Sequence, residues 1–122
     1  MTKILLSTAA CASLATVLSL HLMGWAPPNP VVVKLENAKV KISEVTYQPG
    51  VPRDRFTRPT DQVIVFLDEC KYERKDSVTG EKTIRTRKAG EVIWHDKGED
   101  APVLTNLGTK AYRSLSIELK GQ

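Results

Sequence analysis

Cysteine and histidine are scarce in this chain, and their scarcity excludes whole classes of site. The sequence of 122 residues holds two cysteines and two histidines. Cys11 and His21 fall in the N-terminal segment, which leaves Cys70 and His95 for the rest of the chain. An internal disulfide is therefore excluded there, and the fold depends on its apolar core. We expect Cys70 to be a half-buried small hydrophobic residue.

The chain also lacks a large excess of charge of either sign. Lys and Arg number 18 and Asp and Glu 14, which gives a formal net charge of +4. Two short basic clusters occur, in residues 53–58 and 85–88. A balance of this size favours solubility, and without a recognisable nucleic-acid motif we expect no nucleic-acid partner.

Long hydrophobic runs are absent except at the N-terminus. Residues 1–26 carry one early positive charge, Lys3, followed by an apolar run over residues 4–23 and then by the small residues Gly24 and Ala26. This order of positive, apolar and small residues is typical of a secretory signal peptide. It predicts export to the bacterial envelope, as a periplasmic or secreted protein.

A retained N-terminal anchor is the alternative to cleavage. The apolar run of residues 4–23 is long enough for a helix that crosses a hydrocarbon core of roughly 30 Å, and it would tether the domain to the membrane. Pro27 would directly follow the cleavage point, and a proline there disfavours cleavage. Acylation at Cys11 is a third interpretation, which the lack of leucine three residues earlier disfavours. All three interpretations place the domain outside the cytoplasm.

Beyond residue 30, the 3.6-residue apolar period of a helix is missing. Residues 27–38 predict a proline-stiffened linker and a first strand, and residues 39–120 predict one domain. About eight short apolar or alternating runs, separated by glycine and proline, predict an all-β sandwich or barrel. The clearest run is residues 111–120, where the apolar and polar side chains alternate between two faces.

Three other segments predict particular strand features. The continuous apolar residues 63–67 predict a strand buried on both faces. Residues 39–47 alternate and then slip by one position, which predicts a bulge near Ser43 and Glu44. The polar segments 71–74 and 83–88 predict a solvated hairpin.

Glycines at regular spacing mark two segments, residues 49–67 and 90–108. In the first, Gly50 is followed by five residues, then Phe56-Thr57-Arg58, three more residues and Gln62. In the second, Gly90 and Gly98 lie eight positions apart, and Asn106 follows after a short loop.

This spacing resembles the two motifs of the cupins, over roughly residues 39–119. The resemblance implies an antiparallel jelly-roll barrel with a pocket. The family's first motif has glycine, five residues, His-x-His, three or four residues and glutamate. Its second has glycine, five residues, Pro-x-Gly, two residues, histidine, three residues and asparagine, the position that Asn106 fits with one inserted residue.

The resemblance also places the family's metal ligands, and this chain lacks them. Phe56 and Arg58 stand at the two histidine positions of the first motif and Gln62 at the glutamate position. The histidine of the second motif falls on Ala101 or Pro102. A guanidinium has no lone pair for a metal and an amide oxygen is a poor ligand, so we expect no metal and no cofactor at this site.

Arg58 is open to two interpretations. If it points into the barrel, its guanidinium can clamp a small carboxylate or phosphate, with Gln62 as a second polar contact. Otherwise it points outward or forms an ion pair at the barrel end, and the nearby acids offer partners. These acids are Asp54, Asp61 and Asp68. The candidate ligand-binding residues are Phe56, Arg58, Gln62, Trp94, His95 and Asn106.

His95 and Trp94 are open to two interpretations in the same way. His95 lies between Trp94 and Asp96, where it could serve as a general base oriented by a carboxylate. The alternative is an exposed histidine on the polar face beside an inward Trp94 that belongs to the core rather than to a ligand platform.

The sequence thus favours an exported cupin-like domain, free of metal, that binds a small anion or serves in assembly. The alternative is an enzyme that uses Arg58, Gln62 and His95 in the cupin pocket. Because cupins commonly pair through sheet edges, the resemblance implies that assembly would take the form of a homodimer. Because arginine exchanges no proton near neutral pH, an enzyme requires His95 or a carboxylate in the same cavity as Arg58.

Overall fold

The computed structural model describes residues 28–121. The predicted signal peptide or anchor, residues 1–26, lies outside this range. Within it, no helix could span a membrane.

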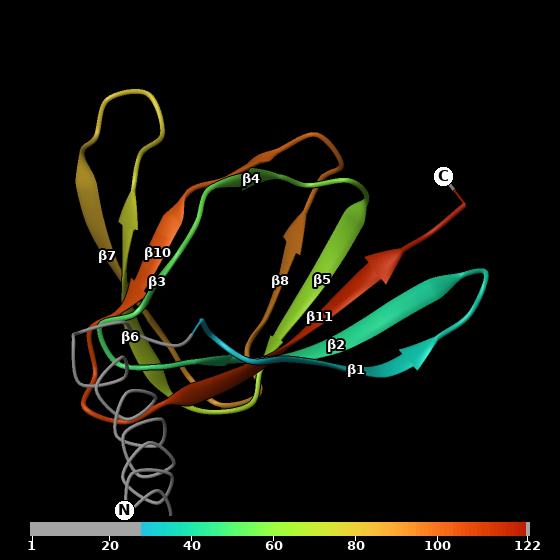
Figure 1. Ribbon diagram of the computed structural model, residues 1–122, viewed down its shortest axis with the longest axis horizontal. Helices are drawn as coiled ribbons and strands as arrows, with labels where there is room; N and C mark the ends of the chain where they lie inside the picture. Colours follow the sequence, from blue (N-terminus) through green and yellow to red (C-terminus); the bar gives the residue numbers. More distant parts are fainter. Residues whose placement is uncertain (1–27, 122) are drawn as a thin grey trace, which may run out of the picture.

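Residues 28–121 form β-strands and no helix, as the sequence predicts (Figure 1). Three of the strands have only two residues each, which is too short to produce a recognisable sequence pattern. The strands are β1 (Val31–Glu36), β2 (Val40–Tyr47), β3 (Pro52–Arg53), β4 (Phe56–Thr57), β5 (Asp61–Phe66), β6 (Cys70–Lys75), β7 (Lys82–Arg87), β8 (Val92–His95), β9 (Asp100–Ala101), β10 (Val103–Asn106) and β11 (Tyr112–Leu119).

The strands form two antiparallel sheets that face each other as the walls of a barrel. One sheet has the order β1-β2-β11-β5-β8 and the other the order β3-β10-β6-β7. Strands β4 and β9 pair with each other, and Figure 1 shows this segment spanning between the two sheets. The β6–β7 pair is the hairpin that residues 71–88 predict.

The apolar core is small and lies at one end of the barrel. It consists of Tyr47, Phe66, Tyr72, Leu104 and Tyr112. The rings of Tyr47 and Tyr112 stack with centroids 4.9 Å apart, and those of Tyr72 and Tyr112 with centroids 6.3 Å apart. Large aromatic side chains fill this end efficiently. The rest of the barrel interior is left for cavities.

Strand β11 faces the interior with its polar side. Ser114 is only 3 % exposed, and it shares its face with the buried Tyr112. Because side chains alternate along a strand, Leu115, Ile117 and Leu119 lie on the outer face. The predicted alternation is confirmed, and the barrel interior takes the serine face.

Two strand predictions are wrong in detail. Within β5, Gln62 and Phe66 are buried, whereas the three residues between them are half-buried. Val63 and Val65 lie on the outer face, which meets solvent, and Ile64 faces the cavities inside the barrel. Strand β2 runs without a bulge against β11. The irregularity lies in β1, at Lys34, between the pairs Val33–Ser43 and Leu35–Ile42. The slip in the β2 pattern arises because the strand has apolar residues on both faces, since Val40 and Ile42 face out and Val45 and Tyr47 face in.

Candidate functional site: an arginine-lined cavity

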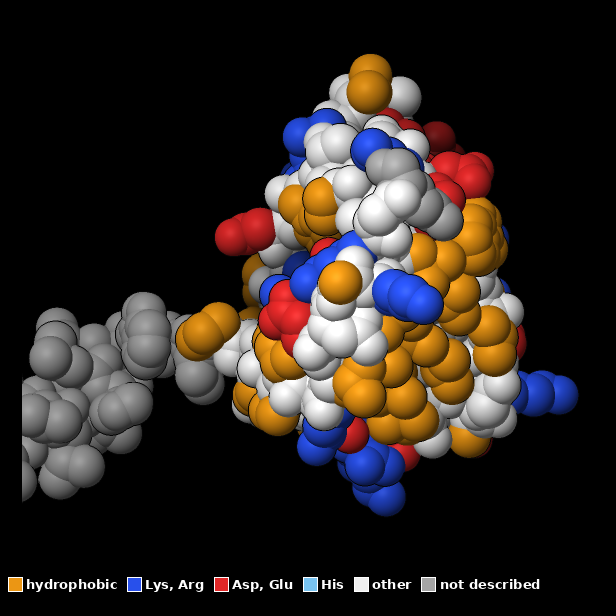
Figure 2. Space-filling view, turned by 90° about the vertical axis from the view of Figure 1, so that its right-hand side faces the viewer, with side chains coloured by type: hydrophobic (Ala, Val, Ile, Leu, Met, Phe, Trp, Pro, Cys, Tyr) orange, Lys and Arg blue, Asp and Glu red, His pale blue; other side chains and the backbone are white. Residues whose placement is uncertain are grey.

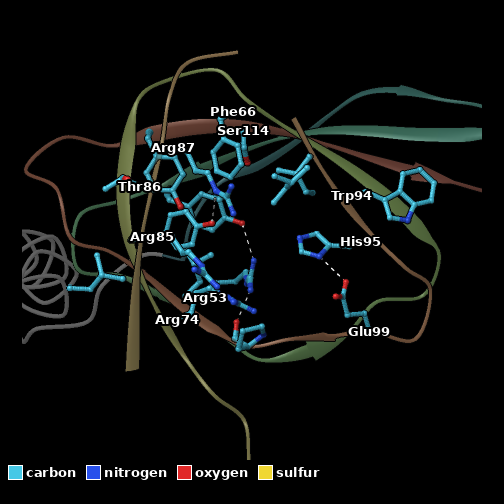
Figure 3. A pocket seen from close by; sticks show the side chains of 18 of the residues that line it. Arg53, Phe66, Arg74, Arg85, Thr86, Arg87, Trp94, His95, Glu99 and Ser114 are labelled. Carbon is cyan, nitrogen blue, oxygen red and sulfur yellow. Dashed lines mark hydrogen bonds and ion pairs between the residues drawn. The ribbon is translucent and has the colours of Figure 1, made fainter. Parts of the chain in front are cut away.

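A cavity of about 580 Å³ lies between the two sheets, beside the aromatic core. Five arginines line it, together with the acid Glu99 and the ring of His95 (Figure 3). Four of them, Arg53, Arg74, Arg85 and Arg87, come from the four-stranded sheet, and the fifth, Arg58, directly follows β4. Cations therefore dominate the charge of the cavity wall.

Arg58 points into the barrel and is buried. Its backbone continues the β4–β9 ladder, since Arg58 N donates to Glu99 O and Gly98 N donates to Arg58 O. The side chain is 6 % exposed, and its Nη1 donates to Gln62 Oε1 at 2.6 Å. The interpretation that places Arg58 outside the barrel is therefore wrong.

The acid that faces Arg58 is Glu99, whose Oε2 lies 3.9 Å from Arg58 Nε. None of the three expected partners takes this place. Asp68 pairs with Arg113, and Asp61 accepts a hydrogen bond from Lys97 N. Asp54 lies on the rim of a neighbouring cavity. The local sequence suggested these three acids, whereas the β4–β9 ladder brings Glu99 to Arg58 from 41 positions away.

Phe56 supports two guanidinium groups. The Cζ atoms of Arg53 and Arg58 lie 5.3 Å and 5.5 Å from the centre of its ring, within the range of cation–π contacts. Burial, and then the charge of Arg53, lower the pKa of Arg58 from its ordinary value. Two like charges thus share one partly desolvated ring, and the Nε atoms of both arginines are buried without a hydrogen-bond partner among the described residues.

His95 faces the barrel interior and Trp94 faces outward, which reverses the interpretation that places Trp94 in the core. The β5–β8 register pairs His95 with the buried Gln62, and Trp94 with Val63 on the outer face. Trp94 is 52 % exposed, and its Nε1 donates to Asp96 Oδ1 at 2.8 Å. Figure 3 shows the imidazole toward the cavity and the indole away from it. An inward Trp94 beside an exposed His95 is therefore wrong.

Glu99 orients the imidazole of His95. His95 Nδ1 lies 2.7 Å from Glu99 Oε2. Burial and the charge of Arg58 lower the pKa of His95 below its usual value of 6.5, and Glu99 offsets part of this effect. The direction of this shift favours the neutral ring over the imidazolium. Because a carboxylate only accepts, Nδ1 carries the proton and Nε2 keeps a lone pair.

Asn106 lies apart from this cavity and holds a turn. Its Nδ2 donates to Tyr47 O and to Lys110 O, and its Oδ1 accepts from Gly108 N. The side chain is buried. All of its polar atoms are engaged, so the expectation that Asn106 contacts a ligand together with Arg58 is not supported by its position.

Sequence reasoning missed most of the cavity arginines and one tyrosine. Arg74 and Arg87 lie in the hairpin that was predicted to be solvated, and Arg87 is held by Glu91 and by Tyr72 Oη. Tyr112 is buried, and its hydroxyl has no partner among residues 28–121. Tyr72 and Arg74 are two positions apart in β6 and therefore lie on the same face of that strand. The sequence alone does not show that this face lines the barrel interior, because that depends on how the two sheets pack.

The fold of this chain is similar to that of several solved structures. It superposes on a cupin domain from Bordetella pertussis Tohama I with a TM-score of 0.69 at 18 % identity, over 80 % of this chain and 98 % of that chain. This chain has a cupin-like fold.

Other solved structures share the cupin-like barrel. A protein with a double-stranded β-helix domain from Klebsiella pneumoniae matches with a TM-score of 0.58 at 16 % identity, over 80 % of this chain and 89 % of that one. An oxalate decarboxylase matches with a TM-score of 0.61 at 15 % identity, and here 81 % of this chain covers 28 % of the other. At these identities the likeness extends to the fold alone. No family model and no curated protein sequence matches the chain.

The residues at the metal positions of the cupin resemblance do not fit a divalent cation. The buried guanidinium of Arg58 occupies this part of the barrel, and a second cation, Arg53, lies on the same ring of Phe56. Across residues 28–121, no cluster of three or more His, Cys, Asp or Glu side chains could hold a metal ion. Two guanidinium groups would repel a metal and attract an anion.

Proposed function

We propose that this cupin-like barrel binds a small carboxylate or phosphate in its arginine-lined cavity, without a metal. The observation that carries the proposal is the pair Arg53 and Arg58. Both guanidinium groups lie against Phe56, and both have a buried Nε without a partner among the described residues. Buried donors in folded proteins are almost always paired, so these two atoms point to an acceptor supplied by a ligand.

The charges around Arg58 support an anionic acceptor. A buried charge without a partner costs several kcal/mol. Glu99 compensates for Arg58 in part, because it lies 3.9 Å away and also binds His95. An anion beside Nε would form a charge-assisted hydrogen bond and complete the compensation. The buried hydroxyl of Tyr112 is another donor without a partner among the described residues, and Tyr112 lines the same cavity.

The test is anion binding by two matched arginine variants. Calorimetry with inorganic phosphate and with acetate should show binding to the wild-type domain, loss of binding in Arg58→Leu, and retention in Arg55→Leu. Arg55 is a suitable control because its guanidinium pairs with Asp100 and is half exposed. Equal binding by all three proteins would refute the proposal. Elemental analysis should find no equivalent of Fe, Mn, Ni or Zn.

A second candidate function is catalysis, and the shared cavity of His95, Glu99 and Arg58 favours it. A neutral imidazole oriented by a carboxylate is suited to accept a proton from a substrate that Arg58 holds. Any carboxylate that co-purifies with the protein, identified by mass spectrometry, can be incubated in D₂O. Exchange of its C–H protons by the wild type but not by His95→Gln would support an enzyme. Absence of exchange would leave binding as the function.

We also propose a homodimer, through the outer face of the five-stranded sheet rather than through sheet edges. Figure 2 shows a broad hydrophobic area on this side of the molecule. The sheet register places eleven apolar residues on that face, of which Val32, Leu35, Val92 and Trp94 are about half exposed. The full set is Val32, Leu35, Val40, Ile42, Val63, Val65, Val92, Trp94, Leu115, Ile117 and Leu119.

The size of this face fits a second copy of the chain. Five strands of up to eight residues span at most about 600 Å², near the roughly 800 Å² that each partner contributes to a standard interface. Sedimentation should show a dimer for the wild type and a monomer for Val65→Lys. A wild-type monomer at high concentration would overturn this assembly.

A further inference from the structure

A second cavity lies inside the same barrel and meets the first at the arginine pair. Its volume is about 320 Å³. Five residues line both cavities, namely Tyr47, Arg53, Arg58, Ile64 and Ser114. A ligand that contacts Arg53 and Arg58 from the arginine-lined side therefore stands at the entrance of a second chamber.

The second chamber has an apolar wall. Val31, Val45 and Ile64 come from β1, β2 and β5 and lie on the inner face of the five-stranded sheet. The ring of Phe56 contributes to the same wall. Apart from the two arginines and Asp54, the polar groups of this chamber are neutral side chains such as Gln62 and Ser116. An apolar group placed against Val31, Val45 and Ile64 would lose contact with water, which is favourable.

Small side chains on the inner face of the five-stranded sheet leave space for the second chamber. Ser116 lies opposite Ser43 and Ile64 in the inner layer, and Ser114 lies opposite Val45 and Phe66. Serines at these positions leave the volume that a larger residue would fill. Val45 and Ile64 remain half-buried although they face the barrel interior. The sheet therefore lacks side chains of its own that would cover these two.

We infer that the ligand of this barrel is amphipathic, with its anionic group on Arg53 and Arg58 and a short apolar body in the second chamber. The inference rests on the proposed function, since the anion site supplies the head-group contact. The ligand class is a carboxylate or phosphate monoester with an alkyl or aryl body. A chamber of about 320 Å³ holds roughly ten groups of the size of a water molecule, which sets the size of that body.

The test is a chain-length series of carboxylates at fixed pH and ionic strength. Acetate, butanoate, hexanoate and octanoate are titrated into the folded domain, with binding followed by NMR shifts. Each added methylene should raise the affinity by up to about fourfold, until the chamber is full. The wild type and the variants are compared by the ratio of their affinity for hexanoate to their affinity for acetate.

Two matched valine variants locate the apolar body. Val45→Thr keeps the shape of the side chain and adds a hydroxyl inside the chamber, so it should lower the hexanoate-to-acetate ratio severalfold and leave acetate binding unchanged. Val92→Thr is the control, because Val92 lies on the outer face of the same sheet and does not line the chamber. Its ratio should equal that of the wild type. Val31→Thr provides a second chamber variant, should Val45→Thr melt at a much lower temperature.

The outcomes separate this inference from the proposed function. A flat series, with acetate binding still lost in Arg58→Leu, overturns the amphipathic ligand and leaves the anion site standing. A rising series that neither chamber variant changes also overturns it, because the body then binds elsewhere. No Arg58-dependent binding by any member defeats both.

Discussion

His95 Nδ1 and Glu99 Oε2 lie 2.7 Å apart on the wall of the arginine-lined cavity. The two residues are four positions apart, at the end of β8 and in the loop before β9. Their contact fixes the tautomer of the imidazole, and the charge of Arg58 opposes its protonation. The pair therefore connects the charges of the cavity to the pKa of a histidine, which they lower.

The pKa of His95 should lie below 6.5 in the folded protein, and NMR titration of the ring protons measures it. Because the pKa is depressed, the unfolded chain binds the proton more readily. The contribution of His95 to stability is present above about pH 6.5 and is lost as the pH falls toward the folded value. Urea unfolding should show this slope in the wild type and a smaller one in His95→Gln. Equal slopes would mean that His95 is not buried beside Arg58.

Gln62→Leu should lower the free energy of unfolding by about 1.5–3 kcal/mol, because it removes the acceptor of a buried hydrogen bond from Arg58. The double variant, with Arg58→Leu as well, should recover most of this loss, since no buried charge remains. Chemical denaturation of the four proteins forms a double-mutant cycle. Additive losses would show that the two side chains are not coupled.

Asn106→Ala should destabilise the fold by about 3 kcal/mol while anion affinity stays unchanged. Its amide makes three hydrogen bonds to backbone atoms around a turn, each worth about 1 kcal/mol. Asn37→Ala is the matched control, because Asn37 caps an exposed turn between β1 and β2 and should cost less. A large change in phosphate or acetate affinity in Asn106→Ala would return this residue to the ligand site.

Cys70 should react slowly with thiol reagents at pH 8 in the folded protein. Burial raises the pKa of its thiol to about 11, so the thiolate is a small fraction at this pH. Labelling should speed up greatly in urea. Fast labelling of the folded domain would contradict the burial of this side chain.

Export remains a prediction of the sequence. Intact mass of the protein taken from its native envelope should correspond to an N-terminus near Pro27. A full-length mass in the membrane fraction would establish the anchor through residues 4–23 instead.

Local patterns sufficed for the fold class. The period of two along residues 111–120 predicts a strand wherever it occurs, because alternation is a property of the extended backbone itself. Gly50, Gly90 and Gly98 mark turns, and all three adopt positive φ angles that other residues rarely take. The spacing after Gly50 left the direction of Arg58 open, and only the structure shows this side chain buried inside the barrel.

The tertiary structure decided which face of each strand is the interior. Hydrophobicity alone would put Leu115 and Trp94 inside, but the barrel encloses cavities lined by serine, arginine and histidine, and its apolar sheet face lies outside. The pairing of His95 with Gln62 and the approach of Glu99 to Arg58 depend on strand registers between distant segments. Such registers follow from the packing of whole sheets, because a strand pattern has the same period whichever of its faces turns inward.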